Sequence, residues 1–167
     1  VKNVGMNPTR SGLLHVLKSM GGKISIKNTA TICNEEVADI LVESSDLHGV
    51  DVKGDIIPII IDEIPILSIA ASFAKGTTLI KDAAELRVKE SDRLAAISDG
   101  LLKINIDHEL FDDGIKINGS DKDIDDLVEI DSHGDHRIAM SFLIASLRSK
   151  NGIQVKDCKN IFTSFPT

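Results

Sequence analysis

The chain has 167 residues, of which 42% are hydrophobic and 27% are charged, as expected for a soluble globular protein with a sizeable core. Its 19 basic and 26 acidic residues give a net charge of −7, which argues against a protein that binds the phosphate backbone of nucleic acids. The sequence has no Trp and no Tyr, so few rings are present on which bases could stack. No apolar run is long enough to span a membrane. A small anion is still a suitable ligand, provided that a few Arg and Lys side chains converge locally.

A weak internal repeat organises the chain. The tripeptides Val1-Lys2-Asn3, Ile80-Lys81-Asp82 and Val155-Lys156-Asp157 each end a strand-like run, at separations of 79 and 75 residues. An apolar run precedes each of the last two, over residues 64–73 and 138–147. Both runs are apolar on almost every side, so we expect two buried helices.

A second, more exposed helix and a pair of strands follow the repeated strand. Asn7-Pro8 is expected to cap and open one such helix, and Asp92 the other. Residues 23–26 and 104–107 alternate between apolar and polar side chains, which is typical of strands. Residues 111–117 contain an Asp-Gly pair followed by alternation and predict a hairpin. The unit is therefore strand, buried helix, strand, exposed helix, strand, strand.

The chain holds one complete copy of this βαβαββ unit, with the second half of a copy before it and the first half of a copy after it. No long linker rich in Gly, Ser or Pro interrupts the sequence. We therefore expect residues 1–167 to form a single α/β domain that is incomplete at both ends, and Val1 in place of methionine agrees with a fragment. Cys33 and Cys158 are too few for a disulfide framework and are expected to be buried, unreactive thiols of a reducing compartment.

The stretch Arg87-Val88-Lys89-Glu90-Ser91-Asp92-Arg93 concentrates charge between a predicted strand at 77–80 and an apolar helix. Ser91 or Asp92 is expected to cap that helix, which puts Arg93 in its first turn. The positive end of the helix dipole disfavours a cation there, unless a bound phosphate or carboxylate shares the site. A solvated loop with an incidental salt bridge is the alternative.

A second stretch repeats this arrangement. Gly134-Asp135-His136-Arg137-Ile138-Ala139-Met140 again places an acidic cap directly before an arginine and an apolar helix. A guanidinium group offers two parallel N–H groups to a phosphate or carboxylate. Arg93 and Arg137 therefore predict an anion site that is formed by matching helix starts.

The sequences RVKESDR (87–93) and GDHRIAM (134–140), with Ile61–Pro65 ahead of them and Thr163–Pro166 behind them, resemble the C-terminal signatures of the EPSP synthase (3-phosphoshikimate 1-carboxyvinyltransferase) family. The resemblance covers nearly all of the chain. It implies two domains of three βαβαββ units each, with helices packed inside and mixed sheets outside, as in an inside-out α/β barrel. This chain would be most of the C-terminal domain.

The resemblance also implies a cytoplasmic, monomeric enzyme of the shikimate pathway. Such an enzyme transfers the enolpyruvyl group of phosphoenolpyruvate to the 5-hydroxyl of shikimate 3-phosphate and releases phosphate. Its reaction needs a base for the hydroxyl, an acid for the enol carbon and cations for two phosphates and a carboxylate. The N-terminal domain would supply the other wall of the site, so we expect the fragment alone to be inactive.

The same resemblance implies roles for individual side chains. Asp62 would contact the shikimate ring and act as general base, and Glu90 would donate or shuttle a proton. Lys89 would help to hold the shikimate phosphate. The residues implied to contact phosphoenolpyruvate are Arg93, His136 and Arg137. No cofactor, metal, nucleic acid or membrane partner is implied.

Alternatives stay open at several of these positions. Asp62 and Glu63 also qualify as simple caps of the following helix. A group of acidic and imidazole side chains has the spacing of a zinc or manganese site, namely Asp131, His133, Asp135 and His136. Some family members carry a lysine in place of Thr163 and an asparagine in place of Glu85, so neither role is carried over. The resemblance gives Arg10 no role.

Two other functions compete with this one. The first is that of UDP-N-acetylglucosamine enolpyruvyl transferase, which shares the fold and the chemistry but lacks this pairing of signatures. The second is that of a non-catalytic repeat domain that binds phosphorylated ligands.

Overall fold

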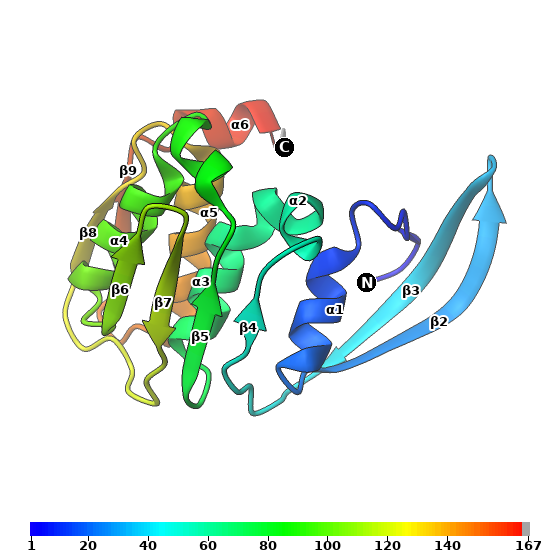
Figure 1. The fold of residues 1–167 in the computed structure, drawn as a ribbon, viewed down its shortest axis with the longest axis horizontal. Coiled ribbons are helices and arrows are strands. Elements are labelled where there is room, and N and C mark those ends of the chain that lie inside the picture. Colours follow the sequence, from blue (N-terminus) through cyan, green and yellow to red (C-terminus); the bar gives the residue numbers. More distant parts are fainter. Residues whose placement is uncertain (165–167) are drawn as a thin grey trace.

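The computed structural model describes residues 1–164, and Figure 1 shows the elements along the chain. The helices are α1 (Gly12–Ser19), α2 (Ile56–Ile60), α3 (Ile64–Ser72), α4 (Arg93–Lys103), α5 (His136–Ala145) and α6 (Ile161–Ser164). Short 3₁₀ turns are η1 (Ile61–Glu63), η2 (Ala84–Val88), η3 (Ser146–Arg148) and η4 (Cys158–Asn160). The strands are β1 (Val4–Gly5), β2 (Lys23–Ile32), β3 (Glu35–Glu43), β4 (Asp51–Val52), β5 (Thr77–Ile80), β6 (His108–Phe111), β7 (Gly114–Asn118), β8 (Val128–Asp131) and β9 (Ile153–Lys156). Phe165 and Pro166, which contribute to the resemblance above, lie outside the described residues.

The predicted βαβαββ unit occupies the middle of the chain as β4, α3, β5, α4, β6 and β7. Its strands form one mixed sheet in the order β4-β5-β7-β6, in which β4 and β5 are parallel and the other pairs are antiparallel. The half unit before it forms the sheet β1-β3-β2, and the half unit after it pairs β8 with β9 in parallel. Because β1-β3-β2 has the order of β5-β7-β6, the repeat predicted from the sequence is confirmed.

Each copy of the repeated tripeptide ends in the same backbone conformation. Asn3, Asp82 and Asp157 have φ angles of 54°, 62° and 55°, in the left-handed region that Asn and Asp tolerate better than most L residues. Oδ2 of Asp82 also accepts a hydrogen bond from the backbone N–H of Gly54 at 2.9 Å. The second and third tripeptides thus mark the point where the chain leaves a strand, β5 or β9, and turns toward the next helix. The prediction that Val1-Lys2-Asn3 also ends a strand is wrong, because β1 follows it at Val4–Gly5.

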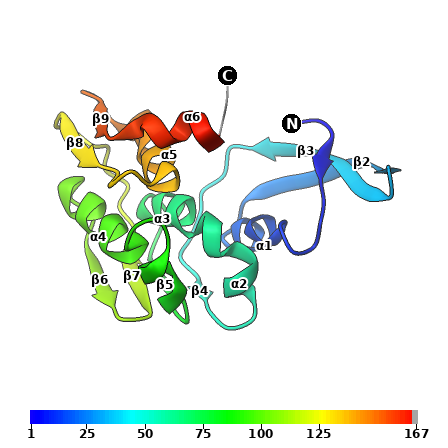
Figure 2. The ribbon, with the colours of Figure 1, turned by 90° about the horizontal axis from the view of Figure 1, so that it is seen from above.

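Helix α3 lies behind the central sheet, and Figure 2 shows it among α1, α4 and α5. Ile64, Leu67 and Ala71 are fully buried, so the prediction of a buried helix over residues 64–73 is confirmed. Helix α5 is buried on one face only, and Leu143 and Ile144 are exposed on the other. The prediction that α5 is buried all round is wrong, because none of the described residues covers that face.

The helix expected directly after Asn7-Pro8 begins later, at Gly12. Oδ1 of Asn7 accepts a hydrogen bond from the backbone N–H of Thr9 at 2.9 Å, and its carbonyl accepts from the N–H groups of Arg10 and Ser11. Asn side chains favour such local turns over the helix interior. Asn7 thus closes a turn and does not cap α1.

The strand predicted over residues 104–107 is absent. Ile104 and Ile106 are buried, but they flank Asn105, which has a φ angle of 57°. The chain turns here after α4, and the strand starts at His108. Two buried isoleucines in a turn therefore produce the same alternating sequence pattern as a strand.

The hairpin predicted over residues 111–117 is confirmed. Phe111 pairs with Gly114, so Asp112 and Asp113 form a two-residue turn. A Cβ atom on Gly114 would lie 2.0 Å from the carbonyl oxygen of Ile80. Glycine is therefore required at this position for the close approach of β7 to β5 and not for the turn itself.

Strands β2 and β3 extend beyond the rest of the molecule as a long hairpin (Figure 1). Cys33, in the turn between these strands, is exposed, so the expectation of a buried thiol is wrong for this residue. Cys158 is partly buried, and this burial raises the pKa of its thiol. Within residues 1–164, no helix has both the length and the apolar character that a membrane span requires.

Candidate active site

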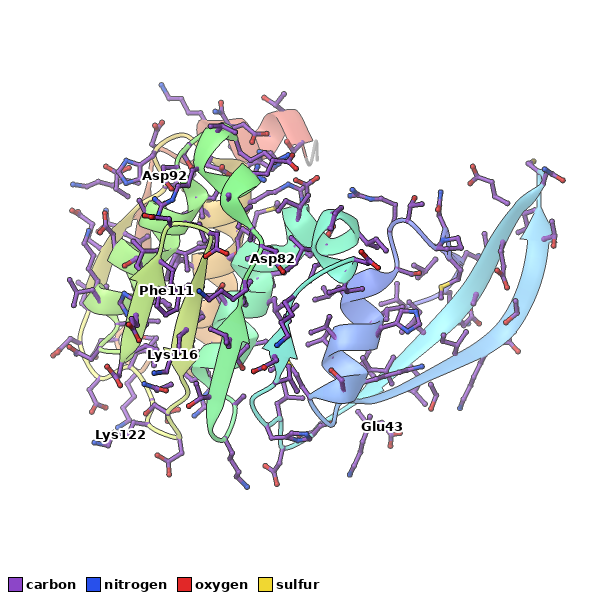
Figure 3. The ribbon with its side chains drawn as sticks, in the orientation of Figure 1. Glu43, Asp82, Asp92, Phe111, Lys116 and Lys122 are labelled. Atoms are coloured by element: carbon purple, nitrogen blue, oxygen red, sulfur yellow. The ribbon has the colours of Figure 1, made fainter. Side chains whose placement is uncertain are left out.

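The N-terminal ends of α4 and α5 meet next to η1, which leads into α3. Oδ1 of Asp92 accepts a hydrogen bond from the backbone N–H of Ala95 at 3.0 Å and caps α4. Oδ1 of Asp135 accepts one from the backbone N–H of Arg137 at 2.8 Å and caps α5. Both predicted acidic caps are confirmed. Figure 3 labels Asp92 at this end of α4.

Arg93 lies at the centre of the site and is 1% exposed. Its Nε donates to Oδ2 of Asp135 at 2.7 Å, its Nη1 to Oδ1 of Asp62 at 3.1 Å and its Nη2 to Oε2 of Glu90 at 2.5 Å. These hydrogen bonds join charged partners and are therefore stronger than neutral ones. A buried charge also needs partners to offset its lost hydration. In this structure Arg93 thus binds three carboxylates, and each of its three guanidinium nitrogens is engaged.

Arg137 is held more loosely. Its Nη2 lies 3.2 Å from Oδ2 of Asp62, and its Nη1 donates to the backbone carbonyl of Asp62 at 3.1 Å. The side chain is 26% exposed, so part of the guanidinium faces solvent. His136 opens α5 beside it and is partly buried, and the described residues offer its ring no hydrogen-bond partner.

Asp62 and Asp135 are held as anions. Burial alone would raise the pKa of Asp62, but the positive charges of Arg137, Arg93 and, further away, Lys89 lower it below its ordinary value. Burial opposes ionisation of Asp135 in the same way. Its hydrogen bonds from Arg93 and from the start of α5 nevertheless lower its pKa. Asp62 alone is therefore a weak base in this arrangement.

Lys89 and Glu90 have different partners. The backbone of Lys89 is extended, and its ammonium group pairs with Glu85 in the preceding turn η2. Glu90 pairs with Arg93 instead. The side chain of Lys89 is 24% exposed, whereas that of Glu90 is 53% exposed. Lys89 therefore lies beside the cluster of Arg93 and its carboxylates, not within it.

Arg10 is a member of the site that the sequence did not suggest. Its guanidinium lies 3.6 Å from Oδ2 of Asp62 and 3.4 Å from Oε1 of Glu63. The start of α1 packs closely on α2, because a Cβ atom on Gly12 would lie only 2.6 Å from the side chain of Ile60. The internal repeat could have indicated that Arg10 belongs to the site, because Arg10 corresponds to Lys89 at the offset of 79 residues that relates Val1 to Ile80.

Arg87 fixes the loop that carries these charges. Its Nε and Nη2 donate to the backbone carbonyls of Asp112 and Phe111, both at 2.7 Å, and its Nη1 donates to Oδ2 of Asp92 at 2.9 Å. The first arginine of the charged stretch therefore links the hairpin turn to the cap of α4. Ser91 adds a weaker contact, since its hydroxyl donates to Oδ2 of Asp135 at 3.2 Å.

The alternative metal site does not form. Both carboxylate oxygens of Asp135 already accept hydrogen bonds, from Arg93, Ser91 and the start of α5. Asp131 accepts the backbone N–H of His133 at 2.8 Å. Within residues 1–164, no three His, Cys, Asp or Glu side chains are grouped so that they could hold a metal ion. Thr163 is exposed on α6, which packs against α5.

Solved structures share this fold. An EPSP synthase from Acinetobacter baumannii matches with a TM-score of 0.95 and 43% sequence identity, over 100% of this chain and 39% of that one. The enolpyruvyl transferase NikO from Streptomyces tendae matches with a TM-score of 0.69 over 96% of this chain and 34% of its own. Its identity of 16% shows the fold alone. The repeated units thus form the fold of an enolpyruvyl transferase domain.

Sequence relatives identify the family. The sequence pattern of "EPSP synthase (3-phosphoshikimate 1-carboxyvinyltransferase)" matches residues 1–167. The 3-phosphoshikimate 1-carboxyvinyltransferase of Petrotoga mobilis is 53% identical over 166 residues, which are 99% of this chain and 38% of that protein. The one of Vesicomyosocius okutanii is 47% identical over 98% of this chain and 37% of its own length. The chain belongs to the EPSP synthase family. It spans about 38% of the length of the relatives that it matches.

Proposed function

We propose that this chain is most of the C-terminal domain of an enzyme that transfers the enolpyruvyl group of phosphoenolpyruvate to the 5-hydroxyl of shikimate 3-phosphate. Phosphate is released, and the reaction belongs to aromatic amino acid biosynthesis. The observation that carries the proposal is the convergence of both signature stretches, through Arg93 and Arg137, on Asp62. We further propose a cytoplasmic, monomeric enzyme without a cofactor, as the family implies.

Arg137 is the proposed contact for phosphoenolpyruvate, supported by its partial exposure and its place at a helix start. His136 lies beside it and would contact the same substrate. Arg93 would act mainly by orienting Asp62 and Glu90, and it would reach phosphoenolpyruvate when Glu90 turns away. Lys89 would hold the shikimate phosphate.

Asp62 is the proposed general base, and Glu90 the proposed proton donor. An anionic substrate on Arg137 would offset the arginine charge and raise the pKa of Asp62, which would make Asp62 a better base when substrate is bound. Glu90 is about half exposed, so it could exchange protons with solvent before the cleft closes. These roles require the substrates to bridge this wall and a facing one.

A phosphate-release assay on the complete gene product with both substrates tests the proposal. We expect turnover from that protein, and none from residues 1–167 alone, because half a cleft lacks positioning and electrostatic stabilisation together. An Arg137→Ala preparation of the same chain serves as the control for contaminating activity. Turnover by residues 1–167 above that control would show that the second wall is not required.

Failure of the complete protein to release phosphate would contradict the proposed activity. Replacing shikimate 3-phosphate by UDP-N-acetylglucosamine tests the acceptor. Turnover only with the sugar nucleotide would replace the proposed acceptor by that of the related enzyme.

A further inference from the structure

The proposed substrate-binding cations are not free in the absence of substrate. Lys89, Arg93 and Arg137 each form an ion pair with at least one carboxylate. An anionic substrate therefore has to share these cations with the carboxylates or displace one of them. The substrate is expected to displace first the carboxylate that is bound most weakly to its cation.

Glu85 has the most exposed side chain of these carboxylates. Its side chain is 59% exposed, and its ion pair with Lys89 is its only polar side-chain contact among residues 1–164. Asp135, by contrast, is fully buried and accepts hydrogen bonds from several groups. Exposed ion pairs four residues apart contribute little to stability. Glu85 can therefore turn into solvent at small cost.

Lys89, in contrast, has a mostly covered side chain. Its side chain is 24% exposed, so most of it lies against the protein. Its backbone follows the turn η2, and the next residue, Glu90, is tied to the buried Arg93. Lys89 is thus a mostly covered cation whose counter-ion, Glu85, is more exposed than the lysine itself. Within the described part of the chain, Glu85 is the only carboxylate at ion-pair distance from Lys89.

We propose that Glu85 is a displaceable counter-ion that occupies Lys89 until the phosphate of shikimate 3-phosphate replaces it, and that Glu85 thereby sets the affinity for that phosphate. This inference rests on the function proposed above and adds a residue that determines affinity. Glu85 both competes with the phosphate for the ammonium group and repels it. Removal of its charge therefore strengthens phosphate binding.

The variant Glu85→Gln keeps the size of the side chain and removes its charge. We expect the dissociation constant of shikimate 3-phosphate to fall by roughly 3- to 10-fold at low ionic strength. The gain shrinks in high salt, because salt screens charges at exposed positions.

Glu109→Gln is the matched control. Glu109 is also 59% exposed and pairs with a lysine, Lys116, at 3.5 Å. Figure 3 shows Lys116 on the sheet, away from the end of α4 that Asp92 marks. Both variants remove one negative charge and one exposed ion pair. The ion pair of Glu109 joins β6 and β7 and includes none of the proposed site residues.

Isothermal titration of the complete protein with shikimate 3-phosphate, at low and at high salt, measures the effect. Tighter binding by Glu85→Gln than by Glu109→Gln, lost in a Lys89→Met background, supports the inference. Equal binding by the two variants, weaker binding by Glu85→Gln, or a gain that persists without Lys89 would overturn it.

A different outcome contradicts the proposed function, namely that the unchanged protein does not bind shikimate 3-phosphate. In that case the unchanged protein, Glu85→Gln and Glu109→Gln are titrated with inorganic phosphate. NMR signals from the region of Lys89 measure the binding. Tighter phosphate binding by Glu85→Gln alone still supports the counter-ion role. Unchanged phosphate binding overturns it.

Discussion

Arg93 and Arg137 each follow an acidic cap at a helix start, Arg93 in the second helix of one repeat unit and Arg137 in the first helix of the next, yet their surroundings differ. Arg93 is 1% exposed and binds three carboxylates. The side chain of Arg137 is 26% exposed, and among residues 1–164 its guanidinium has polar contacts with Asp62 alone, through the carboxylate and the backbone carbonyl. The same sequence pattern, an acidic cap followed by arginine, thus gives a buried arginine at one helix start and a partly exposed one at the other.

A cap-and-arginine pattern therefore fixes where the arginine side chain starts but not which groups its guanidinium contacts. Arg93 follows the charged loop that supplies Glu90, and it faces Asp135 of the next copy. No carboxylate from a later copy reaches Arg137 within residues 1–164. We therefore expect Arg93 to act on the arrangement of the site and Arg137 to act on the substrate. The following variants test that division, and their kinetic parts rest on the proposed function.

Glu90→Gln should have the largest kinetic effect. The change keeps the shape and a hydrogen bond to Arg93 but removes the titratable proton, so kcat should fall by about 10²- to 10⁴-fold if Glu90 moves a proton. Binding of both substrates should change little. Steady-state kinetics and titration of the complete protein measure the two quantities. An unchanged kcat with raised KM values would make Glu90 only a partner of Arg93.

Arg93→Met should have the largest effect on stability. It leaves Asp135 buried without its cation, and breaking a buried pair in this way costs about 3–5 kcal/mol. Urea unfolding of the chain measures the loss. Arg148→Met is a suitable control, because Arg148 donates to Asp123 at 2.7 Å but is 41% exposed. A similar, small loss in both variants would contradict the role of Arg93 as a buried centre.

Arg137→Ala should affect the substrate more than the fold. Loss of a partly desolvated, charge-assisted contact to phosphoenolpyruvate should lower kcat/KM by roughly 30- to 1000-fold, which is about 2–4 kcal/mol. The thermal midpoint should change little, since the side chain is partly exposed. A normal kcat/KM for phosphoenolpyruvate, or a loss of stability as large as that of Arg93→Met, would remove the distinction between the two arginines.

The sequence predicted the local features of the site because short-range chemistry decides them. The caps Asp92 and Asp135 need only the N–H groups two or three residues ahead. The hairpin at 111–117 needs only its turn and its alternation. The false strand at 104–107 shows the limit of such patterns, because burial of alternate residues also arises in a turn.

The pairing of charges could not be predicted in the same way. Arg93 reaches Asp62 and Asp135, which lie 31 and 42 residues away in the chain. Arg10 reaches Glu63 over 53 residues. Which carboxylate meets which arginine depends on how the repeats pack, and a repeat pattern gives only their order. Buried ion pairs also depend on small differences between desolvation and attraction.

The pH dependence of stability should show the smallest difference between the two arginines. The pKa values of Asp62 and Asp135 are lowered in the folded chain. The contribution of these two carboxylates to folding stability is therefore fully present above the unfolded pKa of about 4, and it is lost as the pH falls through the lower folded pKa values.

Arg93→Met removes the main cation of Asp135, so the difference in folding stability between this variant and the unchanged chain should narrow from pH 6 to pH 3, by on the order of 1–2 kcal/mol. Arg137→Ala affects only Asp62, which is 26% exposed, and its stability difference should narrow less because solvent screens that pair. Urea unfolding at several pH values measures both differences. If the Arg93→Met difference stays constant or widens in acid, the carboxylates around Arg93 are not what its charge stabilises.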